Sequence, residues 1–214
     1  MTSGVPDLVA RAWPVLYHVT PQSNLPRLRA MQRLDSPAVL LKGTTYEHRL
    51  NSRRMEDVVT HLNEFEVIIR NQIPLNPSFL EFAEGWSFAD YLVELNSRVF
   101  FWPGDWDGPN GYGQRHRASR FNASSVLLRA RLKEVLVGNP GAVLFLSRFN
   151  TGAPRLYFGR RSPRGPDTFI PAEDWPYAPS RVAEASFAGS VKLPESTEVY
   201  DLTARSWKRV FGDA

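Results

Sequence analysis

The amino-acid sequence predicts an α+β fold, built as a single domain over residues 1–214. Short β-favouring runs and helical patterns follow one another without the regular strand-helix-strand spacing of a parallel sheet. The sequence contains no internal repeat and no heptad pattern. Hydrophobic residues make up 43% of the chain and charged residues 22%, so an ordinary globular core is expected.

In the first half of the chain, a β-favouring run at residues 15–19 precedes the Thr20-Pro21 pair, which indicates a buried strand followed by a turn. Ser87 and Asp90 have the spacing of a capping box and predict the start of a helix. In this half, strands are expected at residues 15–19, 65–69 and 98–102, and helices at 25–31, 55–63, 77–84 and 87–95.

The second half of the chain contains two irregular stretches. Residues 103–114 hold four glycines and two prolines, which predict a loop long enough to act as a lid. Residues 150–180 are dense in Pro, Gly and Arg and predict a second long loop. In this half, strands are expected at residues 124–130, 143–146, 182–187 and 197–202, and helices at 132–137 and 205–211.

Composition and missing motifs exclude several classes of protein. The sequence has no cysteine, which excludes disulfides, thiolate metal sites and a cysteine nucleophile. The four histidines lack the spacing of a zinc site, so no metal is expected. The motifs of Rossmann dehydrogenases, P-loop NTPases and serine hydrolases are absent. No apolar run is long enough to span a membrane and no secretion signal is present, so we expect a cytoplasmic protein without a membrane partner.

One group of segments resembles known enzymes. Leu16-Tyr17-His18-Val19-Thr20, followed by Asn24-Leu25, resembles the opening motif of the DNA-targeting ADP-ribosyltransferase toxins called DarT, in which a Tyr-His-x-Thr strand leads into a helix. Later segments resemble these proteins and an uncharacterised ADP-ribosyltransferase-like family, in the same order along the chain. These segments are residues 69–75, Arg-Val-Phe-Phe-Trp at 98–102, Asn-Thr-Gly at 150–152, Arg-Gly-x-x-Thr-Phe at 164–169, and the Ala-Glu strand at 183–187.

The resemblance implies an ADP-ribosyltransferase-like fold, with a split β-sheet core, flanking helices and long loops. It also implies an NAD-dependent ADP-ribosyltransferase, which releases nicotinamide from its substrate NAD and transfers ADP-ribose to an acceptor. Glu184 is the implied catalytic residue. A carboxylate beside the ribose stabilises the positive charge that develops as nicotinamide leaves, and it can accept a proton from the acceptor. The alternative is an ordinary solvent-facing glutamate on a strand.

The opening motif is expected to contribute to an NAD site. By resemblance, His18 hydrogen-bonds the ribose or the carboxamide of nicotinamide, and Thr20 and Asn24 are polar supports. Tyr17 or Phe101 is expected to stack on the nicotinamide ring. For the histidine the alternative is a buried side chain satisfied by backbone groups, and for the two aromatic residues it is a place in the core.

Arginine supplies most of the positive charge, because only four residues are lysine. Its guanidinium group binds phosphate through paired hydrogen bonds. Arg70 is expected to hold the pyrophosphate of NAD. Arg53, Arg54 and Arg98 are chemically equal competitors for this role.

The acceptor is expected to be a nucleic acid, DNA or RNA, rather than a protein. Position 182 is Val, so the Glu-x-Glu or Gln-x-Glu pair of many protein-directed transferases is absent. Arg115, Arg117 and Arg120 are expected to contact phosphates and Trp106 to stack on a base; a solvated basic turn is an equal alternative. Resemblance also implies a role as a toxin or in defence, with an antitoxin or regulatory protein as a partner. Two alternatives stay open, an NAD glycohydrolase and a non-catalytic protein that binds a nucleotide or nucleic acid.

Overall fold

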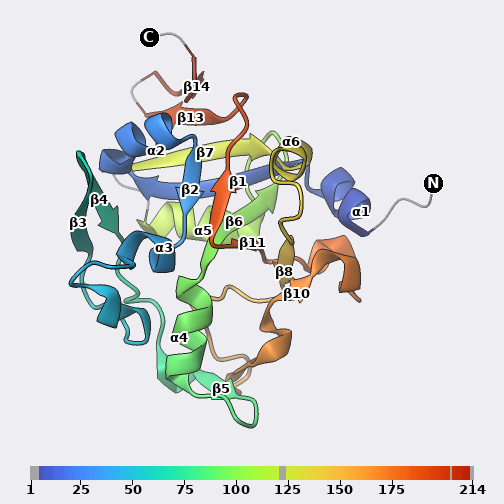
Figure 1. Cartoon of the computed structure of the whole chain (residues 1–214). Helices are drawn as coiled ribbons and strands as arrows, with labels where there is room; N and C mark the ends of the chain where they lie inside the picture. The colour runs from blue at the N-terminus through green and yellow to red at the C-terminus, as the bar shows by residue number, and fades with distance from the viewer. Residues whose placement is uncertain (1–4, 121–123, 203, 213–214) are drawn as a thin grey trace.

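The computed structural model describes residues 5–120, 124–202 and 204–212, without the side chains of residues 5–8, 117, 119 and 120. Within this part of the chain, helices and strands form an α+β fold around a large, eight-stranded antiparallel sheet (Figure 1). The predicted α+β fold class is therefore confirmed. In order across the sheet, the strands are β10 (Ile170–Pro171), β8 (Phe145–Ser147), β11 (Glu184–Ala188), β6 (Arg98–Gly104), β1 (Val15–Pro21), β7 (Ser125–Arg131), β13 (Glu198–Asp201) and β14 (Ser206–Arg209).

Strand β6 joins two parts of this sheet. Its first residues, 98–101, pair with β11, whereas residues 102–104 pair with β1. Residues 18–21 of β1 pair with β7 alone among the described strands. Strands β1 and β6 therefore separate beyond Tyr17, and the sheet opens between them.

Smaller elements surround this opening. Helix α2 (Leu25–Met31) follows β1 and contacts the hairpin of β3 (Val58–Leu62) and β4 (Phe65–Ile69), which lies to one side of the main sheet in Figure 1. Helix α4 (Phe88–Asn96) leads directly into β6. The other elements are α1 (Val5–Ala12), β2 (Arg33–Asp35), α3 (Pro37–Leu41), β5 (Leu80–Phe82), α5 (Gly111–Arg120), α6 (Leu132–Gly138), β9 (Ser162–Arg164) and β12 (Ser190–Lys192).

The largest apolar cluster includes side chains from both parts of the sheet. Leu16 and Leu128 come from β1 and β7, while Phe101, Leu146 and Phe187 come from β6, β8 and β11. Each of these side chains is at most 2% exposed. Burial of one such side chain stabilises the fold by about 1.5–3 kcal/mol. This core therefore holds the two parts of the sheet together although β1 and β6 separate.

Many elements lie where the sequence predicts them. Strand β4 has the predicted bounds, and β1, β6, β7, β8, β11 and β13 overlap the predicted runs, as do α2, α4 and α6. Helix α4 begins with the predicted capping box: the Ser87 hydroxyl accepts a hydrogen bond from Asp90 N at 3.2 Å, and the Asp90 carboxylate accepts one from Ser87 N at 2.8 Å. For these elements, the local amino-acid sequence is sufficient to predict the secondary structure.

Five local predictions are wrong. The expected helix at residues 55–63 contains β3, whose side chains alternate between buried and exposed. The expected helix at 77–84 is a short 3-10 turn followed by β5, and the tail at 205–211 contains β14. The expected lid loop at 103–114 already contains the start of α5, and the expected loop at 150–180 contains the short strands β9 and β10. Pairing of β3 with β4, β5 with β9 and β14 with β13 decides the first three cases, because a partner strand overrides local preference.

Candidate functional site

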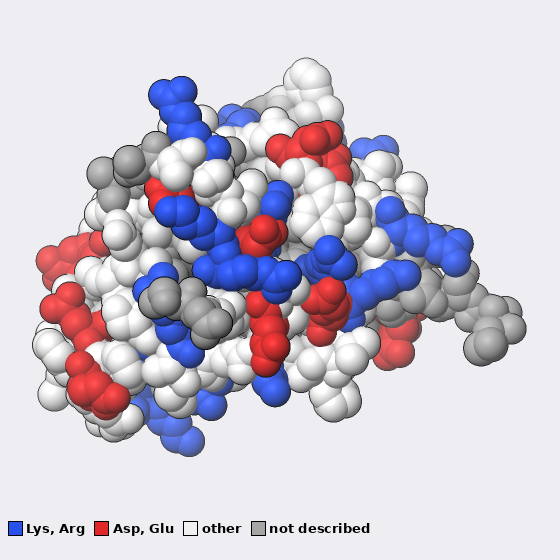
Figure 2. All heavy atoms as spheres, turned by 90° about the horizontal axis from the view of Figure 1, so that it is seen from above, with Lys and Arg blue, Asp and Glu red and all other residues white. Residues whose placement is uncertain are grey.

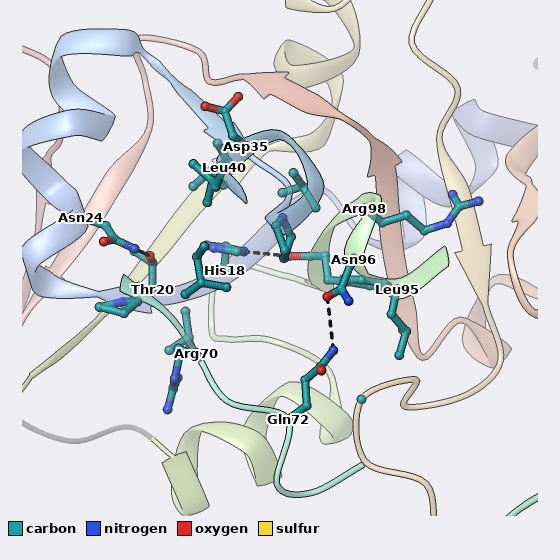
Figure 3. A pocket seen from close by; sticks show the side chains of 18 of the residues that line it. His18, Thr20, Asn24, Asp35, Leu40, Arg70, Gln72, Leu95, Asn96 and Arg98 are labelled. Carbon is teal, nitrogen blue, oxygen red and sulfur yellow. Dashed lines mark hydrogen bonds between the residues drawn. The ribbon is translucent and has the colours of Figure 1, made fainter. Parts of the chain in front are cut away.

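A pocket of about 310 Å³ lies where β1 and β6 separate. This volume is within the range of small-molecule sites. Figure 3 shows His18 near the middle of the pocket, with Thr20 and Asn24 on one side and Asn96 and Arg98 on the other. The polar side chains that line it include those of His18, Thr20, Arg54, Asn96, Thr151 and Glu184.

Glu184 is the first residue of β11 and lies on the pocket wall, with 5% of its surface exposed. Thr151 holds its carboxylate: the backbone N of Thr151 donates to Oε2 at 3.0 Å, and the hydroxyl donates to the same oxygen at 2.5 Å. The structure thus places the predicted catalytic residue inside the pocket. The alternative, a solvent-facing glutamate, is wrong because the side chain is buried.

Two buried side chains hold Thr151 in turn. The Tyr91 hydroxyl donates to the backbone oxygen of Thr151 at 3.0 Å and accepts a hydrogen bond from Arg164 Nε at 2.8 Å. Arg164 is 2% exposed and also donates to the backbone oxygen of Asn150 at 3.4 Å. These bonds connect α4 and β9 to the segment beside β11, so residues far apart in the sequence orient the carboxylate.

Asn110 anchors the chain just before Glu184. Its Nδ2 donates to the backbone oxygens of Val182 at 3.2 Å and Ala183 at 2.8 Å. Its Oδ1 accepts hydrogen bonds from the backbone N–H groups of residues 112 and 113, in the first turn of α5. The segment predicted to be a lid is therefore tied to the strand that carries Glu184.

Burial raises the pKa of Glu184 to about 7. The hydrogen bonds from Thr151 and the positive charge of Arg164 offset part of this effect. Near neutral pH, Glu184 is therefore close to the midpoint between its protonated and ionised forms. A pKa in this range suits a group that exchanges a proton during a reaction.

The stability of the fold should depend on pH through Glu184. Its pKa in the folded chain is above the ordinary value of 4.5, so its stabilising contribution is fully present below that pH and is lost as pH rises through about 7. The loss amounts to about 3 kcal/mol. We expect Glu184→Gln, which cannot ionise, to gain this much stability relative to the wild type between pH 4.5 and pH 8, as measured by urea unfolding.

The difference in stability between the wild type and Glu184→Gln reports on the ionisation of Glu184 alone. Burial lowers the pKa of His18, and the hydrogen bonds of Ser87 lower that of Asp90, so both residues destabilise the fold as the pH falls. These contributions are shared by the wild type and the variant and cancel in the difference. A stability difference that does not change with pH would show that the Glu184 carboxyl is not buried in this way.

His18 lies where the two strands separate, and its ring contacts β6 across the opening. Its Nδ1 is 2.8 Å from the backbone oxygen of Phe100 (Figure 3). A carbonyl oxygen only accepts hydrogen bonds, so Nδ1 carries the proton. Burial lowers the pKa of His18; the bond to Phe100 opposes this change and the charge of Arg70 adds to it. The neutral ring therefore has an unprotonated Nε2, which can accept a hydrogen bond from a ligand.

Arg54 contributes a buried positive charge to the pocket. It is 3% exposed and forms no ion pair with a described carboxylate. Its Nη1 donates to Asn96 Oδ1 at 2.7 Å, and its Nε donates to the backbone oxygen of Arg70 at 3.3 Å. Burial lowers its pKa to about 10, and the negative charge of Asp57 offsets part of the change. A buried cation without a carboxylate is costly unless an anion binds next to it.

The other three arginines differ from Arg54. Arg70, the first candidate from the sequence, also lines the pocket, whereas Arg53 does not and donates to backbone oxygens of residues 72 and 73. Arg98 is paired with Glu94 at 2.9 Å, and its guanidinium lies 4.2 and 4.4 Å from the centres of two phenylalanine rings. It points away from His18 in Figure 3. Arg98 also lines the pocket, but its charge is paired with Glu94 and stacked on the two rings, so its role in binding the ligand stays a prediction.

Thr20 and Asn24 both line the pocket, but the amide group of Asn24 is used by the fold. Its Nδ2 donates to Thr20 Oγ1 at 3.2 Å and to the backbone oxygen of Ile68 at 2.9 Å, and its Oδ1 accepts from Ile68 N at 2.8 Å. Asn24 thus holds β4 next to the start of α2. Its contribution to a ligand site is the shape of the wall.

The prediction that Tyr17 or Phe101 stacks on a ligand is wrong for this structure, because neither residue lines the pocket. Both are at most 2% exposed. The Tyr17 hydroxyl donates to the backbone oxygen of Asp105 at 2.5 Å, and Phe101 packs in the main apolar core. Successive side chains of a strand point to opposite faces. Phe100 and Trp102, on either side of Phe101 in β6, line the pocket instead.

Three of the residues predicted to contact nucleic acid belong to one helix. Arg115, Arg117 and Arg120 lie on α5, but the side chains of Arg117 and Arg120 are outside the described part of the structure. Arg115 stacks on the ring of Tyr112 at 4.7 Å and does not line the pocket. Their predicted role in nucleic-acid binding stays a prediction.

Trp106 is 46% exposed and also lies outside the pocket wall. The guanidinium groups of Arg129 and Arg131 are 5.1 and 5.2 Å from the centre of its indole ring. Figure 2 shows the molecule from above, the side on which β13 and β14 lie, and this face mixes Lys and Arg with Asp and Glu. It is not a continuous basic surface.

The amino-acid sequence alone does not identify the residues that orient Glu184. Thr151 and Arg164 belong to two segments that carry the family resemblance, residues 150–152 and 164–169, but no role follows from the sequence alone. Tyr91 and Asn96, on α4, give no signal, because an aromatic and a polar residue are both ordinary on an amphipathic helix. Their roles become visible only when α4 is packed against the loop segments.

Among the residues that the structure describes, no group of three His, Asp or Glu side chains is placed to hold a metal ion. No helix in the same part of the chain is long and apolar enough to cross a membrane.

Comparison with known proteins identifies a family but no activity. A family model described as "Family of unknown function (DUF7002)" matches residues 14–200. The match includes His18, Arg54, Thr151 and Glu184, and so the main polar groups of the pocket. No curated protein matches the chain.

Proposed function

The chain belongs to this DUF7002 family of unknown function, and we propose that it is an NAD-dependent ADP-ribosyltransferase. The observation that carries the proposal is the Glu184 carboxylate, which is buried on the wall of a small-molecule pocket and held by two hydrogen bonds from Thr151. Carboxyl groups with strongly shifted pKa values in pockets are frequent at active sites. The pocket brings this residue together with His18, from the other segment that resembles ADP-ribosyltransferases.

The proposed reaction gives Glu184 two tasks. The bond between the ribose carbon and the nicotinamide nitrogen breaks, its electron pair leaves with neutral nicotinamide, and the acceptor atom bonds to the carbon and loses a proton. Ionised Glu184 stabilises the positive charge that develops at the ribose. The same carboxylate accepts the proton of the acceptor. Its pKa of about 7 is compatible with both tasks near neutral pH.

Two other groups suit the substrate. The unprotonated Nε2 of His18 can accept a hydrogen bond from a ribose hydroxyl or from the carboxamide of nicotinamide. The Arg54 guanidinium, which has no carboxylate partner among the described residues, suits the pyrophosphate. The opening of the sheet beside β6 also agrees with the split sheet that the resemblance implies.

Binding of NAD tests this proposal before any chemistry is measured. We expect NAD to raise the melting temperature, because a ligand that prefers the folded chain stabilises it by mass action. His18→Ala should weaken NAD binding by up to about tenfold, the value of one neutral hydrogen bond. Isothermal calorimetry measures both affinities, and His61→Ala is the matched control because His61 is exposed on β3, outside the pocket. Absence of binding to the wild type at millimolar NAD would contradict the proposal.

A further inference from the structure

Residues 155–161 form a small hairpin with an apolar tip. The backbone N of Tyr157 donates to the oxygen of Arg160, and the N of Arg160 donates to the oxygen of Tyr157, both at 3.0 Å. Leu156, Tyr157 and Phe158 are 45%, 75% and 87% exposed. The rings of Tyr157 and Phe158 are in contact, with their centres 4.5 Å apart. Adjacent large apolar side chains in solvent indicate a binding surface.

The backbone of the tip does not favour a phenylalanine. Phe158 has a φ of 48° and Gly159 a φ of 74°, so both central residues of the turn are in the left-handed region. Such two-residue turns are normally Asn-Gly, Asp-Gly or Gly-Gly, because larger side chains are disfavoured there. The exposed Phe158 ring gains little from burial in return. The fold therefore gives no reason for this residue, whereas binding of a partner does.

Three arginines surround the tip. Arg155, Arg160 and Arg161 are all exposed. None of them forms an ion pair with a carboxylate in the described part of the chain. The tip thus combines two exposed aromatic rings with three cations whose charges are not neutralised by the protein. This combination suits a ligand that carries both flat rings and negative charges.

The segments on both sides of the hairpin belong to the hydrogen-bond network around Glu184, the catalytic residue of the proposed function. Before the hairpin, Thr151 donates two hydrogen bonds to Glu184. After it, Arg164 donates to the backbone oxygen of Asn150 and to Tyr91, which in turn donates to Thr151. Residues 150–153 line the pocket and lie directly before the hairpin in the chain, so a ligand bound to the hairpin starts within a few residues of the pocket wall.

We propose that this hairpin binds the acceptor and that the acceptor is a single-stranded nucleic acid. Aromatic side chains stack on unpaired bases, and arginines contact the phosphates between them. A single strand is favoured over a duplex because its bases are free to stack. The inference rests on the proposed function for the reaction that follows, but the binding itself can be measured without NAD.

An anionic membrane is the main competing partner, because exposed aromatic and basic residues also bind lipid surfaces. The short stretch of chain between the hairpin and the pocket wall favours a nucleic acid. An acceptor has to reach a ribose carbon inside a pocket of about 310 Å³, and a single nucleotide can do so while its neighbours stay on the hairpin. A lipid surface offers no such extended chain.

The test is binding of a fluorescent 12-nucleotide single strand, as DNA and as RNA, to the full chain without NAD. Phe158→Asn should weaken binding by about 5- to 150-fold, the range for loss of one stacked base. It should leave the melting temperature unchanged or raise it, because Asn is favoured in such a turn. Val137→Asn is the matched control: Val137 is 82% exposed on α6, outside the hairpin, and its replacement should leave binding unchanged.

Salt dependence tests the three arginines. Replacement of Arg155, Arg160 and Arg161 by Gln should lower the slope of log affinity against log salt by about 2, since each phosphate contact on a single strand contributes about 0.7. Equal affinity of the wild type and Phe158→Asn for both strands would overturn the inference. So would binding to phosphatidylserine vesicles, lost in Phe158→Asn, without binding to either strand.

The two proposals can fail separately. Strand binding that depends on Phe158, without release of nicotinamide from NAD, would contradict the enzymatic proposal and leave the binding surface supported. Release of nicotinamide without strand binding would support the enzyme and overturn the inference about its acceptor.

Discussion

Replacement of Glu184 by Gln should lower the rate of nicotinamide release by roughly two to four orders of magnitude, the range for loss of a general base or a key electrostatic group. The amide has nearly the same volume as the carboxyl, so the fold and most of the NAD affinity should remain. It carries no charge to stabilise the ribose and cannot accept the proton of the acceptor. Nicotinamide release measures the rate, and calorimetry measures the affinity.

Glu195→Gln is the matched control for this experiment. Glu195 is exposed and lies outside the candidate pocket, so its replacement should leave nicotinamide release unchanged. A Glu184→Gln protein with wild-type turnover would reject the assignment of Glu184. A variant that neither folds nor binds NAD would identify Glu184 as a structural residue, since its hydrogen bonds with Thr151 would then be needed for the fold.

Replacement of Arg54 by Met should weaken NAD binding by about 10- to 100-fold, because a hydrogen bond to a charged group contributes about 1.5–3 kcal/mol. Met keeps the apolar length of the side chain and removes the buried charge. The affinity for ADP-ribose should fall by the same factor, since it carries the same pyrophosphate. The affinity for nicotinamide should not change. Calorimetry with the three ligands separates loss of an anion site from general damage to the pocket.

Arg53→Met is the control for this variant. Arg53 neighbours Arg54 in the sequence but does not line the pocket, and it donates to the backbone oxygens of residues 72 and 73. Its replacement should leave NAD affinity unchanged. If Arg54→Met folds and binds NAD as tightly as the wild type, the buried guanidinium has only a structural role through Asn96 and the backbone of Arg70.

The parts of the fold that follow from sequence are those decided by nearby residues. The apolar run of β1 and the capping box of Ser87 and Asp90 contain enough local information to place a strand and a helix. The tail at 205–211 does not, because its strand is formed by pairing Trp207 with Tyr200 and its neighbours on β13. For the same reason, the parallel pairing of β5 with β9 is invisible in the sequence, since the two segments are about 80 residues apart.

The candidate site shows the same limit. The sequence singles out His18 and Glu184, and the structure places both on one pocket wall. The sequence cannot show which of several chemically equal arginines binds the pyrophosphate. Only the folded structure shows that Arg54 has no carboxylate partner among the described residues. The sequence also assigns Phe101 to the ligand instead of Phe100 and Trp102. Alternation along β6 puts Phe100 and Trp102 on the face opposite Phe101, but only the packed structure shows which of the two faces meets the pocket.

Incubation of the purified chain with NAD labelled in its adenine part, in the presence of single-stranded DNA, RNA or protein, tests the proposed reaction as a whole. Released nicotinamide and the label retained by each acceptor are then measured separately. We predict that the wild type releases nicotinamide and leaves label on a single-stranded nucleic acid, and that Glu184→Gln does neither above roughly one hundredth of the wild-type rate. Release without retained label would instead identify an NAD glycohydrolase. No release of nicotinamide with any acceptor would contradict the proposed enzyme.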